Sequence, residues 1–196
     1  VKAEGLVEDL SIGIINSRKL SIQSVVNLIA CAEDLYDEEV PIGLHGEEKV
    51  EYRRSPMEIA QVAICKNDIF RLKEEINLPS NYPNIFQILW SNLVLDDVEF
   101  RPMDEKLSIQ GDLKVQIIYE SDDKGIRSYE ASLPFSGNIE CHGCKEGMIP
   151  AISYCIGQQE LSIRPDNDGE ERVIALEALL ELKLKIYEEA KVELIT

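Results

Sequence analysis

Apolar and polar side chains alternate along most of this 196-residue chain, and this alternation constrains the fold more than any other feature. In Lys106-Leu107-Ser108-Ile109-Gln110, and again in 114–117, every second residue is apolar. A period of two is that of a strand with one buried face. The sequence therefore predicts an all-β, antiparallel, sandwich-like fold. Further strand-like runs, separated by turn residues, occur at 10–15, 19–32, 58–65, 70–78, 94–100, 128–135, 149–163 and 173–194.

Two segments refine this prediction. Asp122 to Gly125 separates two strand-like runs, and the glycine can supply the positive φ of a tight hairpin, so 115–119 and 127–135 are expected to pair. The segment 83–90 departs from the alternation, because Pro83 favours a helix start. Its apolar residues recur at helical spacing: Ile85, Phe86, Ile88 and Leu89. We therefore predict one short helix at 83–90, packed on the sheet.

The chain also contains an internal repeat. Leu10-Ser11-Ile12 aligns with Leu161-Ser162-Ile163, and after turns of different length 18–20 aligns with 172–174. We predict that residues 1–42 are the C-terminal part of a first repeat, 43–56 a linker, and 57–196 a complete second domain. The first copy of this tandem repeat is truncated, so its apolar strand edges would be exposed. We expect the sequence to be an excerpt of a longer protein.

Charge and composition exclude several classes of function. The net charge is -17, from 37 acidic and 20 basic side chains, and the acidic residues are spread along the chain. Nucleic-acid surfaces need clustered positive charge, and an anionic lipid leaflet repels such a chain, so neither partner is expected. The sequence shows neither a secretory signal nor an apolar run long enough to span a membrane. We expect a cytosolic protein whose five cysteines are reduced and mostly buried.

The compact motif Cys141-His142-Gly143-Cys144 has the spacing of half a zinc site or of a thiol redox pair. A tetrahedral zinc site would require further ligands. A thioredoxin-like pair would need a following helix, which Gly147 and Pro150 disfavour. We expect a loop with incidental cysteines, no metal and no cofactor, and keep Cys141, His142 and Cys144 as weak candidates for metal or redox chemistry.

An ordered series of short segments carries a family resemblance. It comprises Glu-Glu-Ile-Asn-Leu-Pro at 74–79, an Ile-Leu pair within 85–89, Lys-Leu-Ser-Ile-Gln-Gly-Asp-Leu at 106–113, Ile-Ile-Tyr at 117–119, Leu-Pro-Phe-Ser at 133–136 and the run 172–187. This series resembles the SPOCS (DUF3794-type) domain of spore-forming Firmicutes. It is similar to the clostridial spore coat morphogenetic protein that pairs SPOCS with LysM, although this chain contains no LysM sequence. Residues 16–22 are similar to the end of a preceding SPOCS copy.

The resemblance implies a non-enzymatic scaffold in spore coat assembly that acts through sheet edges or faces. It implies a location on the cytoplasmic, mother-cell side of the forespore surface, and partners among coat or morphogenetic proteins or copies of the chain itself. It supplies no catalytic residues. The alternative is a carbohydrate- or peptidoglycan-binding β-sandwich with Tyr82, Phe86 and Trp90 as a stacking platform. We instead expect these rings to pack in the core.

Overall fold

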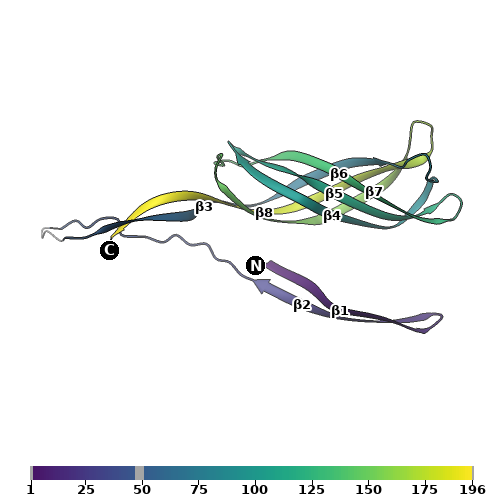
Figure 1. Ribbon diagram of the computed structural model, residues 1–196, viewed down its shortest axis with the longest axis horizontal. Coiled ribbons are helices and arrows are strands. Elements are labelled where there is room, and N and C mark those ends of the chain that lie inside the picture. The colour runs from purple at the N-terminus through teal and green to yellow at the C-terminus, as the bar shows by residue number, and fades with distance from the viewer. Residues whose placement is uncertain (1, 47–50, 196) are drawn as a thin grey trace. The chain divides into compact units, whose positions relative to one another are not determined.

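A computed structural model describes residues 2–46 and 51–195, and every regular element in these ranges is a β-strand (Figure 1). All hydrogen-bonded neighbours run antiparallel, which confirms the predicted all-β, antiparallel class. The described part of the chain contains no helix capable of crossing a membrane. The strands are β1 (Lys2–Asn16), β2 (Lys19–Cys31), β3 (Arg54–Asn77), β4 (Ile85–Met103), β5 (Lys106–Ser121), β6 (Ile126–Glu140), β7 (Ile149–Pro165) and β8 (Glu171–Ile195).

The chain divides into two compact units, Val1–Val50 and Glu51–Thr196. The division falls inside the predicted linker 43–56, of which residues 47–50 lie outside the described ranges. Strand β3 begins at Arg54, ahead of the predicted domain start at 57.

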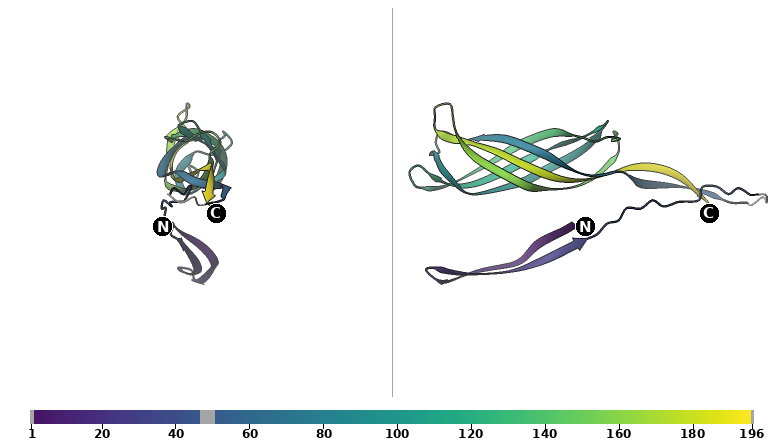
Figure 2. Two further views of the ribbon diagram at one scale, coloured as in Figure 1. Left: turned by 90° about the vertical axis from the view of Figure 1, so that its left-hand side faces the viewer. Right: turned by 180° about the vertical axis from the view of Figure 1, so that it is seen from behind.

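Unit 2 is built from two three-stranded sheets that enclose one core. Their strand orders are β3-β8-β7 and β4-β5-β6, and β4 lies beside β7 while β3 lies beside β6. Seen end-on, the six strands surround the core, and β3 and β8 continue beyond it as a two-stranded ribbon (Figure 2). The central strands β5 and β8 supply most of the fully buried side chains: Leu107, Ile109, Leu113, Val115, Ile117 and Tyr119 from β5, and Ile174, Leu176, Ala178, Leu180, Leu182, Leu184 and Ile186 from β8.

The short helix predicted at 83–90 is wrong, because this segment is the start of β4. The β4–β5 ladder skips one β4 residue between Ile85 and Gln87 and another between Ile88 and Trp90. Each β-bulge adds a residue to one strand, so successive inward side chains lie three apart instead of two. Ile85 and Ile88 both point to the core with this spacing, which the sequence pattern cannot distinguish from one turn of a helix.

The described residues of unit 1 form a single hairpin, β1–β2, followed by residues 32–46 without regular structure. Its ladder corrects the alignment of the repeat. Ile12 pairs with Ile22 as Leu161 pairs with Leu176 in the β7–β8 hairpin. Residues 12–14, and not 10–12, therefore correspond to 161–163. The predicted alignment was therefore two residues out of register. It still placed the aligned side chains on the same face of the strand, because the side-chain period is two.

The expectation that most cysteines are buried is wrong. Cys31, Cys65 and Cys155 are exposed, whereas Cys141 and Cys144 are buried. Cys65 pairs with Lys185, and Cys155 with Glu181, at positions on the outer faces of their strands. An apolar stretch predicts a strand, but it does not predict on which face each of its thiols lies.

Candidate interaction surface

The two bulges at the start of β4 place extra apolar side chains on the outside of the sheet. The residues that the ladder skips are Phe86 and Leu89, which are 68% and 48% exposed. In a regular strand, consecutive side chains point to opposite faces, so one of two consecutive residues would face the core. The bulges allow Phe86 to lie outside next to Gln87, and Leu89 next to Trp90.

Trp90 completes this surface with a partner on the neighbouring strand. It pairs with Ile118 of β5, and the two side chains are 50% and 37% exposed. We name Phe86, Leu89, Trp90 and Ile118 the β4 patch. The adjoining outer positions are mostly polar, although Ile126 of β6 is also exposed, and Gln116 donates a hydrogen bond of 3.0 Å to Glu130. An apolar cluster with aromatic rings and a polar surround is typical of protein-binding surfaces.

The prediction that the three aromatic rings pack in the core is correct only for Tyr82. The Tyr82 ring is half-buried and makes an edge-on contact with Tyr129, with 5.2 Å between ring centroids. Phe86 and Trp90 are exposed, because they lie on a bulged strand and not on a helix that packs against the sheet.

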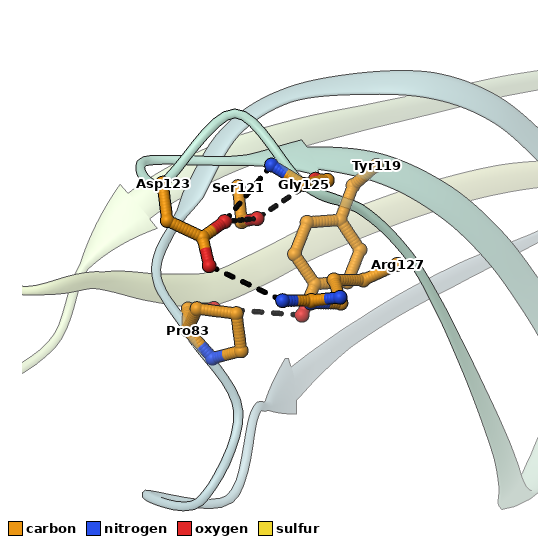
Figure 3. Close-up of polar contacts among 6 residues, drawn as sticks. All are labelled: Pro83, Tyr119, Ser121, Asp123, Gly125 and Arg127. Atoms are coloured by element: carbon orange, nitrogen blue, oxygen red, sulfur yellow. Dashed lines mark hydrogen bonds and ion pairs between the residues drawn. The ribbon is translucent and has the colours of Figure 1, made fainter.

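The segment just before β4 is held by polar contacts from neighbouring parts of unit 2, and Figure 3 shows the contact between Tyr119 of β5 and Pro83. The hydroxyl of buried Tyr119 donates to the Pro83 carbonyl oxygen at 3.4 Å. The Asn84 carbonyl oxygen accepts from the Asp122 amide at 3.2 Å, and its side-chain oxygen accepts from Arg172 Nε at 2.8 Å. These contacts fix the backbone immediately before Phe86, so the β4 patch begins on a well-anchored segment.

The β5–β6 turn beside it forms as predicted, but with a different residue in the left-handed conformation. Lys124 has the positive φ, 64°, and not Gly125. The Gly125 amide donates to Asp123 at 2.9 Å, and the Ser121 hydroxyl lies within hydrogen-bonding distance of the same carboxylate. Arg127 adds an ion pair at 3.2 Å. The hydrogen bond from Ser121, followed by that from the Gly125 amide, lowers the pKa of Asp123.

The Cys-His-Gly-Cys segment is a loop tied to the β4–β5 turn. The Glu105 carbonyl oxygen accepts from the Cys141 amide at 3.0 Å, and the Glu105 amide donates to the Cys144 carbonyl at 2.9 Å. The Glu105 carboxylate accepts from the Gly143 amide at 3.2 Å and lies 3.2 Å from His142 Nδ1. Glu105 makes these contacts with a positive φ of 58°.

This loop separates His142 from the two cysteines, which lie next to each other. Cys141 and Cys144 are fully buried, while the side chain of His142 is 89% exposed. Within the described residues, no group of three or more His, Cys, Asp or Glu side chains is placed to hold a metal. Burial, followed by the neighbouring Cys144, raises the pKa of the Cys141 thiol. The expectations of no metal and no cofactor stay predictions.

The fold and the surface together define a class: an antiparallel all-β domain with an exposed apolar patch on one sheet. Residues 84–163, which span β4, β5, β6 and nearly all of β7, match the protein-family model described as SipL, SPOCS domain. This match over residues 84–163 supports a SPOCS domain in this part of the chain, and such a domain suggests a sporulation-related module. No curated protein and no solved structure matches the chain.

Proposed function

We propose that this chain is a non-enzymatic scaffold of spore coat assembly and that its SPOCS domain binds other proteins through the outer face of β4. The observation that carries this proposal is the β4 patch within the matched segment. Trp90 is the only tryptophan of the chain, and it is half-exposed. Tryptophan is the residue type most enriched among those that dominate binding energy at protein interfaces.

The placement of the ionisable groups supports a role without catalysis. The Asp96–Lys114 and Arg54–Glu193 pairs lie on the outside of the domain with exposed side chains. A buried thiol with a raised pKa, such as Cys141, stays protonated at neutral pH and is a poor nucleophile. His142 is exposed and contacts Glu105, which leaves it outside the buried cysteine pair.

The proposal includes a place and a set of partners. We infer a location on the cytoplasmic, mother-cell side of the forespore surface, and partners among other coat or morphogenetic proteins. The net charge of -17 favours partners with a basic rim around an apolar centre, because opposite charges steer association.

A localisation experiment in sporulating cells tests the proposal. A fluorescent fusion of the full chain is expected at the forespore surface, and Trp90→Asp is expected to disperse it through the mother cell. Ile69→Asp is the matched control, because Ile69 is 61% exposed on β3, away from the patch. An interface residue of this kind contributes about 2 kcal/mol or more, or roughly a 30-fold loss of affinity.

Two results would contradict the proposal. Dispersal through the mother cell of the fluorescent fusion without any substitution would exclude the coat role. Retention of Trp90→Asp at the forespore would exclude the β4 patch as the binding surface. Dispersal by both substitutions would point to general misfolding, which circular dichroism of the purified variants would detect.

A second candidate function is carbohydrate or peptidoglycan binding, which the exposure of Phe86 and Trp90 favours. Gln87 and Glu120 form a hydrogen bond of 2.7 Å beside the rings and could contact sugar hydroxyls. Sedimentation with purified sacculi tests this function. Pelleting that Trp90→Ala abolishes, with a blue shift of tryptophan emission, would support it, whereas a chain that stays in the supernatant would exclude it.

A further inference from the structure

Cys141 and Cys144 form a buried pair of thiols that the proposed function does not use. Both residues are 0% exposed, whereas the other three cysteines of the chain are exposed. The pair lies in the loop between β6 and β7, which carries the chain from one sheet to the other. The β4–β5 turn that holds this loop is at the opposite end of β4 from the β4 patch. The pair is therefore a separate feature of the domain.

The backbone of this loop brings the two cysteines together in a tight turn. The Cys144 amide donates a hydrogen bond of 3.0 Å to the Cys141 carbonyl oxygen, and Gly143 has a φ of 79°. A hydrogen bond across four residues with a positive φ at the third is typical of a type II turn, whose end Cα atoms lie within about 7 Å. A disulfide requires Cα atoms about 4.4–6.8 Å apart. The turn therefore suits a disulfide between its two end residues.

A single residue of the β4–β5 turn holds both cysteines in place. The Cys141 amide donates to the Glu105 carbonyl oxygen at 3.0 Å, and the Glu105 amide donates to the Cys144 carbonyl oxygen at 2.9 Å. The Glu105 carboxylate also accepts from the Gly143 amide at 3.2 Å. Because both cysteines bind the backbone of one residue on another turn, the fold fixes their separation in addition to the local turn.

The two side chains are in contact inside the domain. Burial raises the pKa of the Cys141 thiol, followed by the effect of Cys144, which also hydrogen-bonds to it. A thiol with a raised pKa is a slow nucleophile and a poor leaving group. Such a pair is unsuited to rapid catalytic exchange, but a disulfide between its members resists reduction. The chemistry of the pair therefore favours a stabilising bond over a catalytic one.

We propose that Cys141 and Cys144 are the site of an intramolecular disulfide, formed by exchange with a low-molecular-weight disulfide such as oxidised glutathione. One cysteine attacks the small disulfide and releases a first small thiol, and the other cysteine then displaces the second. One S–S bond forms and one breaks, two electrons pass to the small disulfide, and the two protons end on the released thiols. The bond closes the β6–β7 crossover at the β4–β5 turn. This inference goes beyond the proposed function and does not depend on it.

The test measures the exchange equilibrium in the full chain carrying Cys31→Ser, Cys65→Ser and Cys155→Ser, which removes the exposed thiols. The chain is incubated with mixtures of oxidised and reduced glutathione until the disulfide fraction, measured by alkylation and mass spectrometry, is constant. We expect the equilibrium constant in the native chain to exceed that in urea by at least ~10-fold, because the fold holds the thiols together. By linkage, the oxidised chain resists unfolding by the same factor, about 1.4 kcal/mol.

Two variants in this background serve as controls. Cys144→Ser should abolish the stability gained with oxidised glutathione, because no intramolecular bond can form. His142→Ser should retain both the exchange equilibrium and the stability gain, because the His142 side chain is 89% exposed and lies outside the buried pair.

Four outcomes would overturn the proposal: equal equilibrium constants in the native and unfolded chain, mixed disulfides with glutathione as the only product, an oxidised chain that is no more stable, or stoichiometric zinc that blocks oxidation and is lost in Cys144→Ser. The last outcome would assign the pair to a metal. The experiment uses no spore component and leaves Trp90 unchanged, so its failure is distinguishable from failure of the forespore localisation.

Discussion

At the scale of single residues, Gly137 shows how one missing side chain shapes the core. A Cβ atom at Gly137 would lie 2.5 Å from two ring carbons of Phe70, closer than any real contact. Phe70 in turn packs against Phe135, with 6.3 Å between ring centroids. The glycine thus leaves space for an aromatic ring that bridges β3 and β6, which lie beside each other in different sheets.

We therefore expect Gly137→Ala to lower the free energy of unfolding by about 1–3 kcal/mol, as for other overpacked sites. Urea denaturation followed by circular dichroism measures this change. The double variant Gly137→Ala/Phe70→Leu should recover part of the loss, because the smaller side chain vacates the space. An unchanged Gly137→Ala midpoint would show that Phe70 moves aside without cost.

Asp123 gives the domain an acid-sensitive turn. Its pKa is lowered by the Ser121 hydrogen bond and the Gly125 amide, so the folded state favours the charged carboxylate. This contribution is present above the ordinary Asp pKa of about 3.9 and is lost as pH falls through the lower folded value. We expect Asp123→Asn to flatten the dependence of melting temperature on pH below about 4, and an identical dependence in both proteins would contradict this role.

At the scale of elements, β5 determines which side chains are core and which are surface. Ile117 is 1% exposed and its neighbour Ile118 is 37% exposed, although both are isoleucines in one apolar run. Ile117 belongs to the core, while Ile118 belongs to the β4 patch beside Trp90. Because side chains alternate along the strand, Ile117 stabilises the fold whereas its neighbour Ile118 is a candidate binding residue.

We expect Ile117→Ala to lower the free energy of unfolding by about 2–5 kcal/mol, because it leaves a cavity in the core. Ile118→Ala should cost at most about 1 kcal/mol, the size of one cross-strand contact. Chemical denaturation of the two variants compares them directly. Equal losses would mean that Ile118 is packed, and would remove it from the patch.

At the scale of the whole molecule, the two units differ in how their apolar faces are covered. Unit 2 has a closed core, whereas the strands in the described part of unit 1 form one hairpin, and an isolated two-stranded hairpin is marginally stable in water. We expect amides in β1–β2 to exchange roughly 100-fold or more faster than those in β5 and β8. Hydrogen exchange with mass spectrometry tests this prediction, and equal protection would show that the β1–β2 hairpin is already covered in the purified chain.

The sequence alone determined the all-β class, the inner face of β5, the β5–β6 hairpin and the SPOCS resemblance. These follow from alternation and local turn chemistry, which are properties of one segment at a time. Only the tertiary structure decided the start of β4, because a bulge belongs to a ladder between two strands and leaves a helix-like spacing in one of them. It also decided which faces are covered: Leu20 and Ile174 have the same pattern in sequence, but only Ile174 lies opposite a second sheet.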